Sequence, residues 1–299
     1  MVLRPNLPLL LTSLSWGFNF VALKILYVQL QPASVGLFRF GLMWVLLMAI
    51  CHLRGDSLRY PKGEALRILG LGFLAMGAYM VFFLEGMKGS TAAEGAIILA
   101  TSPIFTALIA GAAKQEKLNF GSLFGAAIAF AGVVLVILGG VQAAAEQNDK
   151  LVGNILVLIS AVVWAASTVY SKPLVEKHPP FRILTLSMPG AIPVLLPYGF
   201  LATTQIEWST LTLLTWTMLG HVAVLAGVVG FAGFYAGVRQ IGAPATMLYQ
   251  FLVPPIAALF AWWVLGQAMQ PWQFVGLVIV LGGVSVSMHF RSKAPAAGP

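Results

Sequence analysis

Long apolar runs, separated by short connections that carry charges or proline, fill almost all of this 299-residue sequence. Each run has roughly the 20 apolar residues that a helix needs to cross a membrane. Backbone groups surrounded by lipid must hydrogen-bond within their own segment, so runs of this length predict helices. Only 9% of the residues are charged and 59% are hydrophobic, which leaves too little charge to cover a water-soluble domain. We therefore expect an all-α integral membrane protein with ten transmembrane helices, at residues 7–28, 33–53, 65–87, 91–113, 119–140, 151–172, 181–203, 211–238, 243–264 and 271–290.

The lysines and arginines predict the orientation of these helices. If the N-terminus lies inside, 13 of the 17 basic residues fall in cytoplasmic segments, and only Lys88 and Lys150 fall in outside connections. Cytoplasmic segments of membrane proteins are enriched in Lys and Arg. We therefore expect a multi-pass protein of the cytoplasmic (inner) membrane, with both termini in the cytoplasm. The net charge of +8 follows from this topology and does not indicate nucleic-acid binding.

Cofactors and covalent cross-links are not expected. The single Cys51 excludes a disulfide framework and a Cys-x-x-Cys metal site. No small-residue cleavage site interrupts the apolar stretch after Arg4, so the first helix is expected to remain as a signal anchor. The expected partners are the lipid bilayer and a small-molecule substrate, and the chain is compatible with a monomer.

Several residues recur at a constant spacing, which indicates an internal duplication. An offset of 151 residues pairs Gly86, Pro103, Glu116, Gly125 and Gly132 with Gly237, Pro254, Gln267, Gly276 and Gly283. An offset of 148 residues pairs Trp16, Lys24 and Pro32 with Trp164, Lys172 and Pro180. Chance matching in a glycine-rich chain is the alternative. We expect a first five-helix repeat at 1–141, a linker at 142–150, a second repeat at 151–290 and a cytoplasmic tail at 291–299. Because five is odd, the repeats would be inverted, as in many secondary transporters whose site lies near the membrane midplane.

Short motifs in both halves are shared with one family. They are Trp16-Gly17-Phe18-Asn19-Phe20, Pro32, Arg39-Phe40, the run Ser-Pro-Ile-Phe-Thr-Ala-Leu at 102–108, its echo at 254–259, and a glycine-rich helix closing each half. In these motifs the chain resembles the drug/metabolite transporter superfamily, specifically its EamA-type members. The resemblance implies ten helices and export of amino acids or similar metabolites, and the chain is most similar to aromatic amino-acid exporters. The family's Gly-Glu pair is here Gln115-Glu116 and Gly266-Gln267, which weakens any essential role shared by two glutamates.

Two prolines at equivalent places of the repeats draw attention to the membrane midplane. Pro103 and Pro254 lie near the middle of predicted helices, where proline removes a hydrogen bond and kinks the helix. The kinks are either purely structural or also hinges beside a cavity. The nearest polar groups belong to Thr101, Ser102 and Gln250.

Aromatic and polar side chains on the predicted helices indicate a substrate cavity. Trp16, Asn19 and Phe20 share one face of the first helix by their spacing. An aromatic pocket with a few polar groups suits an amphipathic zwitterion, although each aromatic residue could instead pack the bundle or face lipid. His221 could couple protons or simply bond across helices. The substrate-binding candidates are Trp16, Asn19, Phe20, Tyr79, Phe83, Thr101, Ser102, Trp164, His221, Tyr235, Tyr249 and Gln250.

Four charged residues, Lys24, Arg39, Glu85 and Glu94, fall within predicted helices, towards the outer half of the membrane. Charges inside a membrane are costly and usually pair with one another or line water. We expect Lys24 or Arg39 to pair with Glu85 or Glu94 as an outer gate or structural clasp. Binding of a substrate carboxylate or ammonium is the alternative.

Transport of a small molecule is the function class that the sequence favours. Export of aromatic or other neutral amino acids comes first, and nucleotide sugars, drugs or phosphorylated metabolites are alternative cargoes. An intramembrane enzyme is disfavoured, because no His-Glu-x-x-His or Gly-x-Ser-x-Gly motif occurs and Asp56 and Asp149 both lie in predicted loops. Ten helices argue against a seven-helix receptor, no filter sequence suggests a channel, and no phosphate-binding loop supports ATP-driven pumping.

Overall fold

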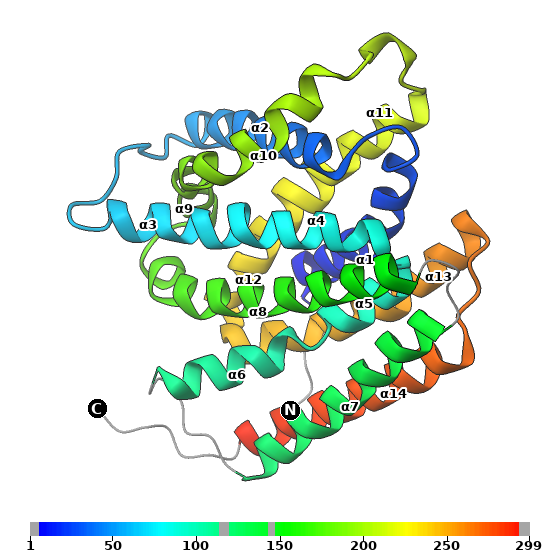
Figure 1. Cartoon of the computed structure of the whole chain (residues 1–299). Helices are drawn as coiled ribbons and strands as arrows, with labels where there is room; N and C mark the ends of the chain where they lie inside the picture. Colours follow the sequence, from blue (N-terminus) through cyan, green and yellow to red (C-terminus); the bar gives the residue numbers. More distant parts are fainter. Residues whose placement is uncertain (1–5, 114–119, 143–146, 293–299) are drawn as a thin grey trace.

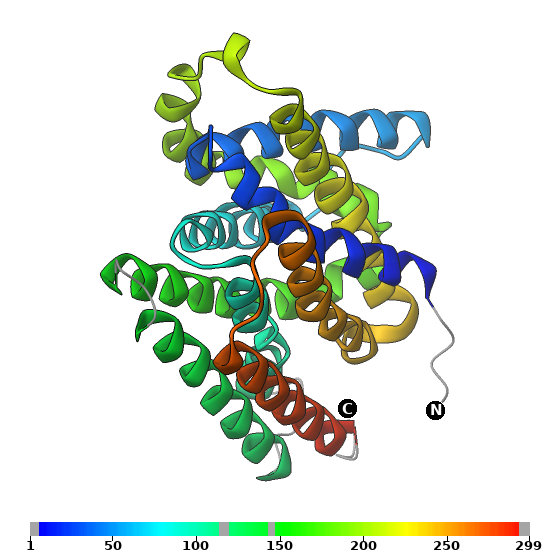
Figure 2. The same cartoon turned by 90° about the vertical axis from the view of Figure 1, so that its right-hand side faces the viewer.

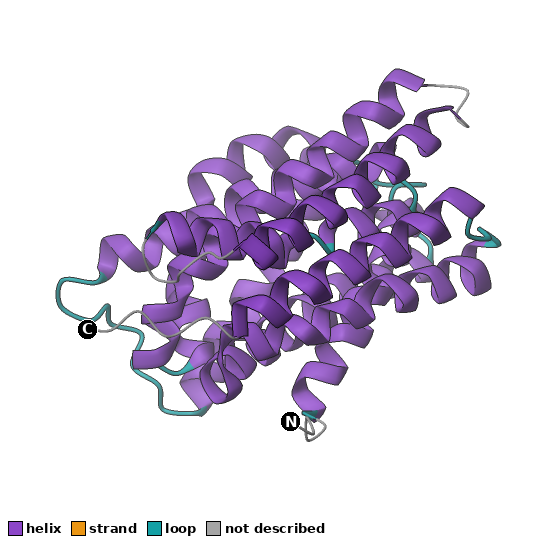
Figure 3. Cartoon of the chain, turned by 90° about the horizontal axis from the view of Figure 1, so that it is seen from below, coloured by secondary structure: helices purple, strands orange, loops and turns teal. Residues whose placement is uncertain are grey.

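The computed structural model describes residues 6–113, 120–142 and 147–292. These residues form helices and connecting turns without any strand (Figure 3). Seven of the helical segments are long and apolar enough to cross a membrane, and three shorter apolar helices accompany them at 123–139, 250–265 and 271–287. Gln115, Glu116 and the tail after Ser292 lie outside the described residues.

The helices of the first half begin where capping signals occur. The side chain of Asn6 accepts a hydrogen bond from the Leu9 amide, and Pro32 supplies a first-turn residue that needs no hydrogen-bond partner. Thr91 and Glu94 form a reciprocal capping box. The elements are α1 (Leu7–Leu26), α2 (Pro32–Leu53), α3 (Ala65–Gly72), the π-helix η1 (Phe73–Ala78), α4 (Tyr79–Gly89), α5 (Ala92–Leu99), α6 (Ser102–Ala112) and α7 (Phe120–Gln142).

The second half follows the predicted pattern with two differences. The elements are α8 (Gln147–Lys177), α9 (Pro180–Ser187), η2 (Met188–Ala191), α10 (Ile192–Thr204), η3 (Trp208–Thr210), α11 (Leu213–Gly220), η4 (His221–Val229), α12 (Gly230–Tyr249), η5 (Gln250–Leu252), α13 (Val253–Leu265) and α14 (Pro271–Ser292). First, α8 begins inside the predicted linker. Second, helical structure in α12 continues through the predicted connection at 239–242, because Arg239 and Gln240 mark the end of an apolar run and not the end of helical hydrogen bonding.

Two π-helical segments occupy corresponding places in the two halves. Element η1 starts at Phe73 and η4 starts at His221, which is 148 residues later, the spacing that also relates Trp16 to Trp164. A π-helix is rare, and π-type turns occur frequently at functional sites. Each segment continues directly into an α-helix that carries aromatic residues.

The two prolines mark helix starts, so the prediction that they kink continuous helices is wrong. Ala100 and Thr101 form a turn, after which α6 begins with Pro103 at its second residue. In the second half, η5 separates α12 from α13, and Pro254 is the second residue of α13. Proline is tolerated in a first helical turn because the amide it lacks would have no partner there.

Helices α7 and α14 lie side by side at one edge of the molecule (Figures 1 and 2). Four glycines bring them together. A Cβ built at Gly125 would lie 2.6 Å from the Gly283 carbonyl oxygen, and one built at Gly276 would lie 3.1 Å from the Gly132 carbonyl oxygen. Rising residue numbers in α7 meet falling numbers in α14, so the two helices are antiparallel.

The first helix of each half packs against the other half. Helix α1 lies against α12 and α13, and α8 lies against η1 and α4. Glycine again permits the approach, since a Cβ at Gly86 would lie 2.7 Å from the Val157 amide nitrogen, and one at Gly237 would lie 2.6 Å from Cδ2 of Leu9. The sequence halves are therefore interlocked and do not lie side by side as separate bundles.

Candidate functional site

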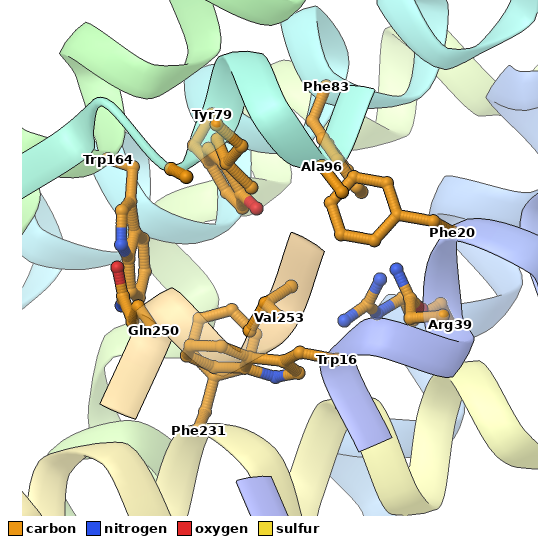
Figure 4. Close-up of a pocket in the computed structure, with 13 residues that line it drawn as sticks. Trp16, Phe20, Arg39, Tyr79, Phe83, Ala96, Trp164, Phe231, Gln250 and Val253 are labelled. Atoms are coloured by element: carbon orange, nitrogen blue, oxygen red, sulfur yellow. The ribbon is translucent and has the colours of Figure 1, made fainter. Parts of the chain in front are cut away.

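A cavity opens where helices of both halves meet (Figure 4). It is narrow, with a cavity volume of about 40 Å³. Both helix breaks reach it, through Ala100 in the first half and Gln250 in the second. The lining consists of Trp16, Asn19, Phe20, Arg39, Tyr79, Phe83, Ala96, Leu99, Ala100, Trp164, Phe231, Gln250 and Val253.

Six of the thirteen lining residues are aromatic, and their rings come from the four helices α1, α4, α8 and α12. The rings of Trp16 and Trp164, which are equivalent in the repeats, meet edge to face with centroids 5.7 Å apart. Phe231 lies 5.7 Å from Trp16 and 5.5 Å from Trp164, and Tyr79 lies 5.2 Å from Trp164. Such offset and edge-to-face pairs are the favoured geometries of aromatic rings, so the wall is held by mutual contacts.

The π-helical segments orient this wall. The indole Nε1 of Trp16 donates a hydrogen bond of 3.0 Å to the carbonyl oxygen of Ala226 within η4. Gly230 leaves room for the indole, because a Cβ there would lie 2.3 Å from Nε1. In the first half, α4 starts at Tyr79 directly after η1, and Tyr79 stacks on Phe83 at 5.5 Å.

Three polar side chains of the lining have buried atoms without a hydrogen-bond partner among the described residues. These atoms are Oδ1 of Asn19, Nε and Nη1 of Arg39, and Nε2 of Gln250. Buried polar groups are almost always paired in proteins, and an unpaired one costs free energy. The cavity therefore offers unsatisfied donors and acceptors to a ligand.

Seven of the twelve predicted substrate-binding residues lie in this lining: Trp16, Asn19, Phe20, Tyr79, Phe83, Trp164 and Gln250. Apolar lining residues such as Ala96, Leu99, Ala100 and Val253 carried no signal in the sequence. Phe231 could have been found, because it follows Phe83 by 148 residues, the repeat offset.

The other five candidates lie outside the lining. The hydroxyls of Thr101 and Ser102 donate to carbonyls of the preceding turn at 2.6 Å each. His221 approaches the Ser15 carbonyl at 3.2 Å, Tyr235 is fully buried among other side chains, and the Tyr249 hydroxyl accepts from the Asn6 amide at 3.1 Å. The Thr101 and Ser102 bonds are local to the break between α5 and α6, whereas the His221 and Tyr249 contacts join distant segments of the chain.

The expected pairing of Lys24 or Arg39 with Glu85 or Glu94 is wrong. Glu94, only 1% exposed, forms an ion pair of 2.5 Å with Lys150 and accepts from Nε2 of Gln273 at 3.3 Å. Glu85 accepts from the Tyr198 hydroxyl at 2.6 Å, and Lys24 donates to the Lys88 carbonyl at 3.2 Å. These partners come from distant parts of the sequence: Lys150 lies on α8, Gln273 on α14 and Tyr198 on α10, so only the packing of the helices brings them near.

A second ionic cluster ties the connection between α2 and α3 to the start of α9. Glu64 contacts Nζ of Lys177 at 3.1 Å and Nε2 of His178 at 2.6 Å, and hydrogen bonds from His178 and Lys177 lower the pKa of the Glu64 carboxyl. Arg182 donates to the carbonyls of Ser57 and Arg59 at 2.8 and 2.9 Å.

The two clusters lie at opposite ends of α8. Lys150 and Lys177 are 27 residues apart in this helix, which corresponds to about 40 Å at the α-helical rise. A bilayer with its headgroups has a similar thickness, about 40–45 Å. We name them the Glu94 cluster and the Glu64 cluster. Among the described residues, no group of three or more His, Cys, Asp or Glu side chains could hold a metal ion.

Comparison with known proteins identifies the family. Residues 4–138 and 151–288 both match the EamA-like transporter family. The chain belongs to this family. As an EamA-like protein with long apolar helices, it is a multi-pass membrane protein.

Several relatives share low identity over nearly the whole chain. An uncharacterized transporter of Bacillus subtilis is 25% identical over 91% of this chain and 89% of its own length. A probable terminal-alkyne amino-acid exporter of Streptantibioticus cattleyicolor is 24% identical, covering 92% and 90%. A probable amino-acid metabolite efflux pump of Escherichia coli is 24% identical, covering 93% of each chain. One crystal structure has the same fold, with a TM-score of 0.65 at 17% identity over 96% of this chain and 97% of that one.

Proposed function

We propose that this EamA-like protein is a secondary transporter that exports aromatic or other neutral amino acids, and related small metabolites, across the cytoplasmic membrane. The observation that carries the proposal is the cavity, in which aromatic rings surround unsatisfied polar atoms of Asn19, Arg39 and Gln250. An amino acid with an apolar side chain has the matching division into polar and apolar parts. The names of relatives as amino-acid exporters support this substrate class.

The proposed architecture is ten transmembrane helices in two inverted repeats. The seven long segments together with the three shorter apolar helices equal the ten proposed crossings in number, which supports this count. The antiparallel contacts of Gly125 with Gly283 and of Gly132 with Gly276 support inversion, because the repeat offset of 151 converts one contact into the other. The matched π-helices support the duplication, and the positions of the basic residues favour cytoplasmic termini.

Transport in this proposal proceeds by alternating access to the cavity. The Glu94 cluster joins α5 to α8 and α14 at one end of the molecule, and the Glu64 cluster joins the start of α3 to the end of α8 at the other. Opening either end requires that the ion pair there separates. In this proposal the two clusters are gates that open alternately. The Glu94–Lys150 ion pair takes the role that the sequence predicted for a pair of Lys24 or Arg39 with Glu85 or Glu94.

Reconstituted vesicles test the function directly. Three sets of vesicles are loaded with labelled phenylalanine, threonine or a nucleotide sugar. Vesicles that contain the protein should release phenylalanine faster than protein-free vesicles do. Replacing Trp164 in the cavity by alanine should abolish this release, whereas Trp263→Ala should not, because Trp263 is 74% exposed on the outside of α13. Release of the nucleotide sugar alone would overturn the amino-acid proposal. Repeating the measurement under a pH gradient shows whether protons are coupled.

A further inference from the structure

Arg39 has the arrangement of an anion-binding group that lacks its anion. The residue lies about two turns after the start of α2, is 4% exposed, and directs its side chain into the cavity beside Phe20 (Figure 4). Its Nε and Nη1 atoms have no hydrogen-bond partner among the described residues, and no ion pair within that part of the chain includes it. A buried charge is stable only when it is paired and hydrogen-bonded.

No described residue that lines the cavity carries a negative charge to balance Arg39. Arg39 is the only ionisable group of strong charge among the thirteen lining residues. The two carboxylates of the neighbouring helices are engaged elsewhere, Glu85 with the Tyr198 hydroxyl and Glu94 with Lys150. The site therefore presents one fixed positive charge inside an aromatic enclosure.

We propose that Arg39 binds the carboxylate of the transported molecule, and that this carboxylate, not the amino group, is the feature the cavity requires. The inference rests on the proposed transport function and defines its substrate class as aromatic or apolar monocarboxylates, with or without an amino group. A guanidinium presents parallel N–H donors that match both oxygens of a carboxylate. The desolvated ion pair forms only when the substrate enters.

An ammonium group finds weaker partners in the same cavity. No carboxylate occurs among its described lining residues, so the side-chain acceptors there are neutral, among them Oδ1 of Asn19 and the faces of the aromatic rings. An amide oxygen accepts a hydrogen bond without neutralising the charge. The amino group of an amino acid is therefore accommodated without being required.

Gln250 suits the other end of the ligand. In Figure 4 it lies beside Trp164, while Arg39 lies on the opposite side of the cavity, with Trp16 and Val253 between them. A carboxylate held by Arg39 places the apolar body of the ligand along the aromatic wall. Nε2 of Gln250 then donates to a polar substituent at the far end of that body.

Three small ligands that differ in one charged group test the proposal on the wild-type protein. Binding of L-phenylalanine, 3-phenylpropionate and phenethylamine to protein in lipid nanodiscs is measured by titration calorimetry and by intrinsic tryptophan fluorescence, to which Trp16 and Trp164 in the cavity contribute. We expect 3-phenylpropionate to bind within about tenfold of phenylalanine, and phenethylamine about 100-fold more weakly, the scale of losing a buried charge-assisted pair. Equal binding of phenethylamine and 3-phenylpropionate, or no binding of any of the three, would overturn the proposal.

Substitution assigns the preference to Arg39. The Arg39→Gln variant should bind 3-phenylpropionate about 100-fold more weakly and phenethylamine no more weakly than the wild type, and Arg39→Lys should retain an intermediate preference. Arg67→Gln is the matched control, because Arg67 is exposed on α3 outside the cavity. Unchanged 3-phenylpropionate binding by Arg39→Gln would refute the assignment. If that variant does not fold, the wild-type series still decides.

Binding and vesicle flux separate this inference from the proposed function. Arg39-dependent binding of 3-phenylpropionate without any amino-acid flux would remove the proposed export of amino acids and leave the carboxylate site in place. Amino-acid flux that phenethylamine inhibits as strongly as 3-phenylpropionate would retain the transporter and refute the carboxylate requirement.

Discussion

Two adjacent glycines of α14 provide a controlled test of the close packing between α7 and α14. A Cβ built at Gly283 would lie 2.4 Å from the Ala129 amide nitrogen and 2.7 Å from the Gly125 carbonyl oxygen, whereas a Cβ at Gly282 would meet nothing within 4 Å. The first distance is about 1 Å shorter than the optimum for non-bonded atoms. The clashing atoms belong to backbone, so relief requires the two helices to move apart.

The two alanine variants should therefore have opposite effects on stability. Each gains about 0.5–1 kcal/mol in helix propensity over glycine, so the difference between them isolates the steric cost at Gly283. Overpacking of a tight interface costs about 1–3 kcal/mol, because separated helices lose dispersion contacts along their length. Gly283→Ala should melt about 2–12 °C below Gly282→Ala, at roughly 2–4 °C per kcal/mol for a chain larger than 150 residues.

The measurement is thermal unfolding of the two purified variants in the same detergent, followed by the loss of helical circular dichroism. The melting temperature of the wild-type protein, measured in the same series, shows whether each variant is more or less stable than the wild type. Equal melting temperatures for the two variants would mean that the helices are not in contact at Gly283, and the antiparallel glycine packing would then be wrong.

Three further substitutions test the ties around the cavity. Replacing Glu94 by Gln strands Lys150 and should cost at most about 3–5 kcal/mol, and adding Lys150→Met should recover much of the lost melting temperature; additive losses would contradict the pair. Hydrogen bonding to His178 lowers the pKa of Glu64 in the folded protein. This pairing therefore stabilises the fold at pH values above the ordinary pKa of 4.5, and the stabilisation is lost as the pH falls through the pKa of the folded state. On acidification, the melting temperature of Glu64→Gln should fall less than that of the wild type. Trp16→Phe should cost about 0.5–1.5 kcal/mol by removing the indole hydrogen bond; an unchanged melting temperature would contradict that role.

The sequence predicted the positions of the helices closely, because apolar length is a signal that each segment carries by itself. The predicted helix at 33–53 corresponds to α2 (Pro32–Leu53), and that at 65–87 to the continuous segment from α3 to α4. The π-helical segments could not be predicted, since a shift in hydrogen-bond register leaves composition and apolar length unchanged. Pro103 and Pro254 do interrupt the helices, as expected, but each lies in the first turn of a new helix and not at a kink within a continuous one.

The candidate site was predicted only in part, because repeat spacing can be read from the sequence whereas contacts between packed helices cannot. Repeat spacing identified Trp16 and Trp164, and their rings are in contact. Partners that depend on how helices pack were not accessible: Glu94 meets Lys150 only because α8 lies against the first half. Arg39 was predicted to pair with a glutamate, whereas its surroundings in the cavity contain none.

The exchange of first helices between the two halves has a consequence for how the protein is made. When residues 1–141 have entered the membrane, α8 has not yet been inserted, so the face of α4 around Gly86 and Gly89 has no cover except lipid. Helix α1 likewise lacks its packing partners until α12 and α13 have been inserted. The first half therefore completes its packing only after the second half has been translated, and a chain cut in its linker should assemble only when both fragments are produced together.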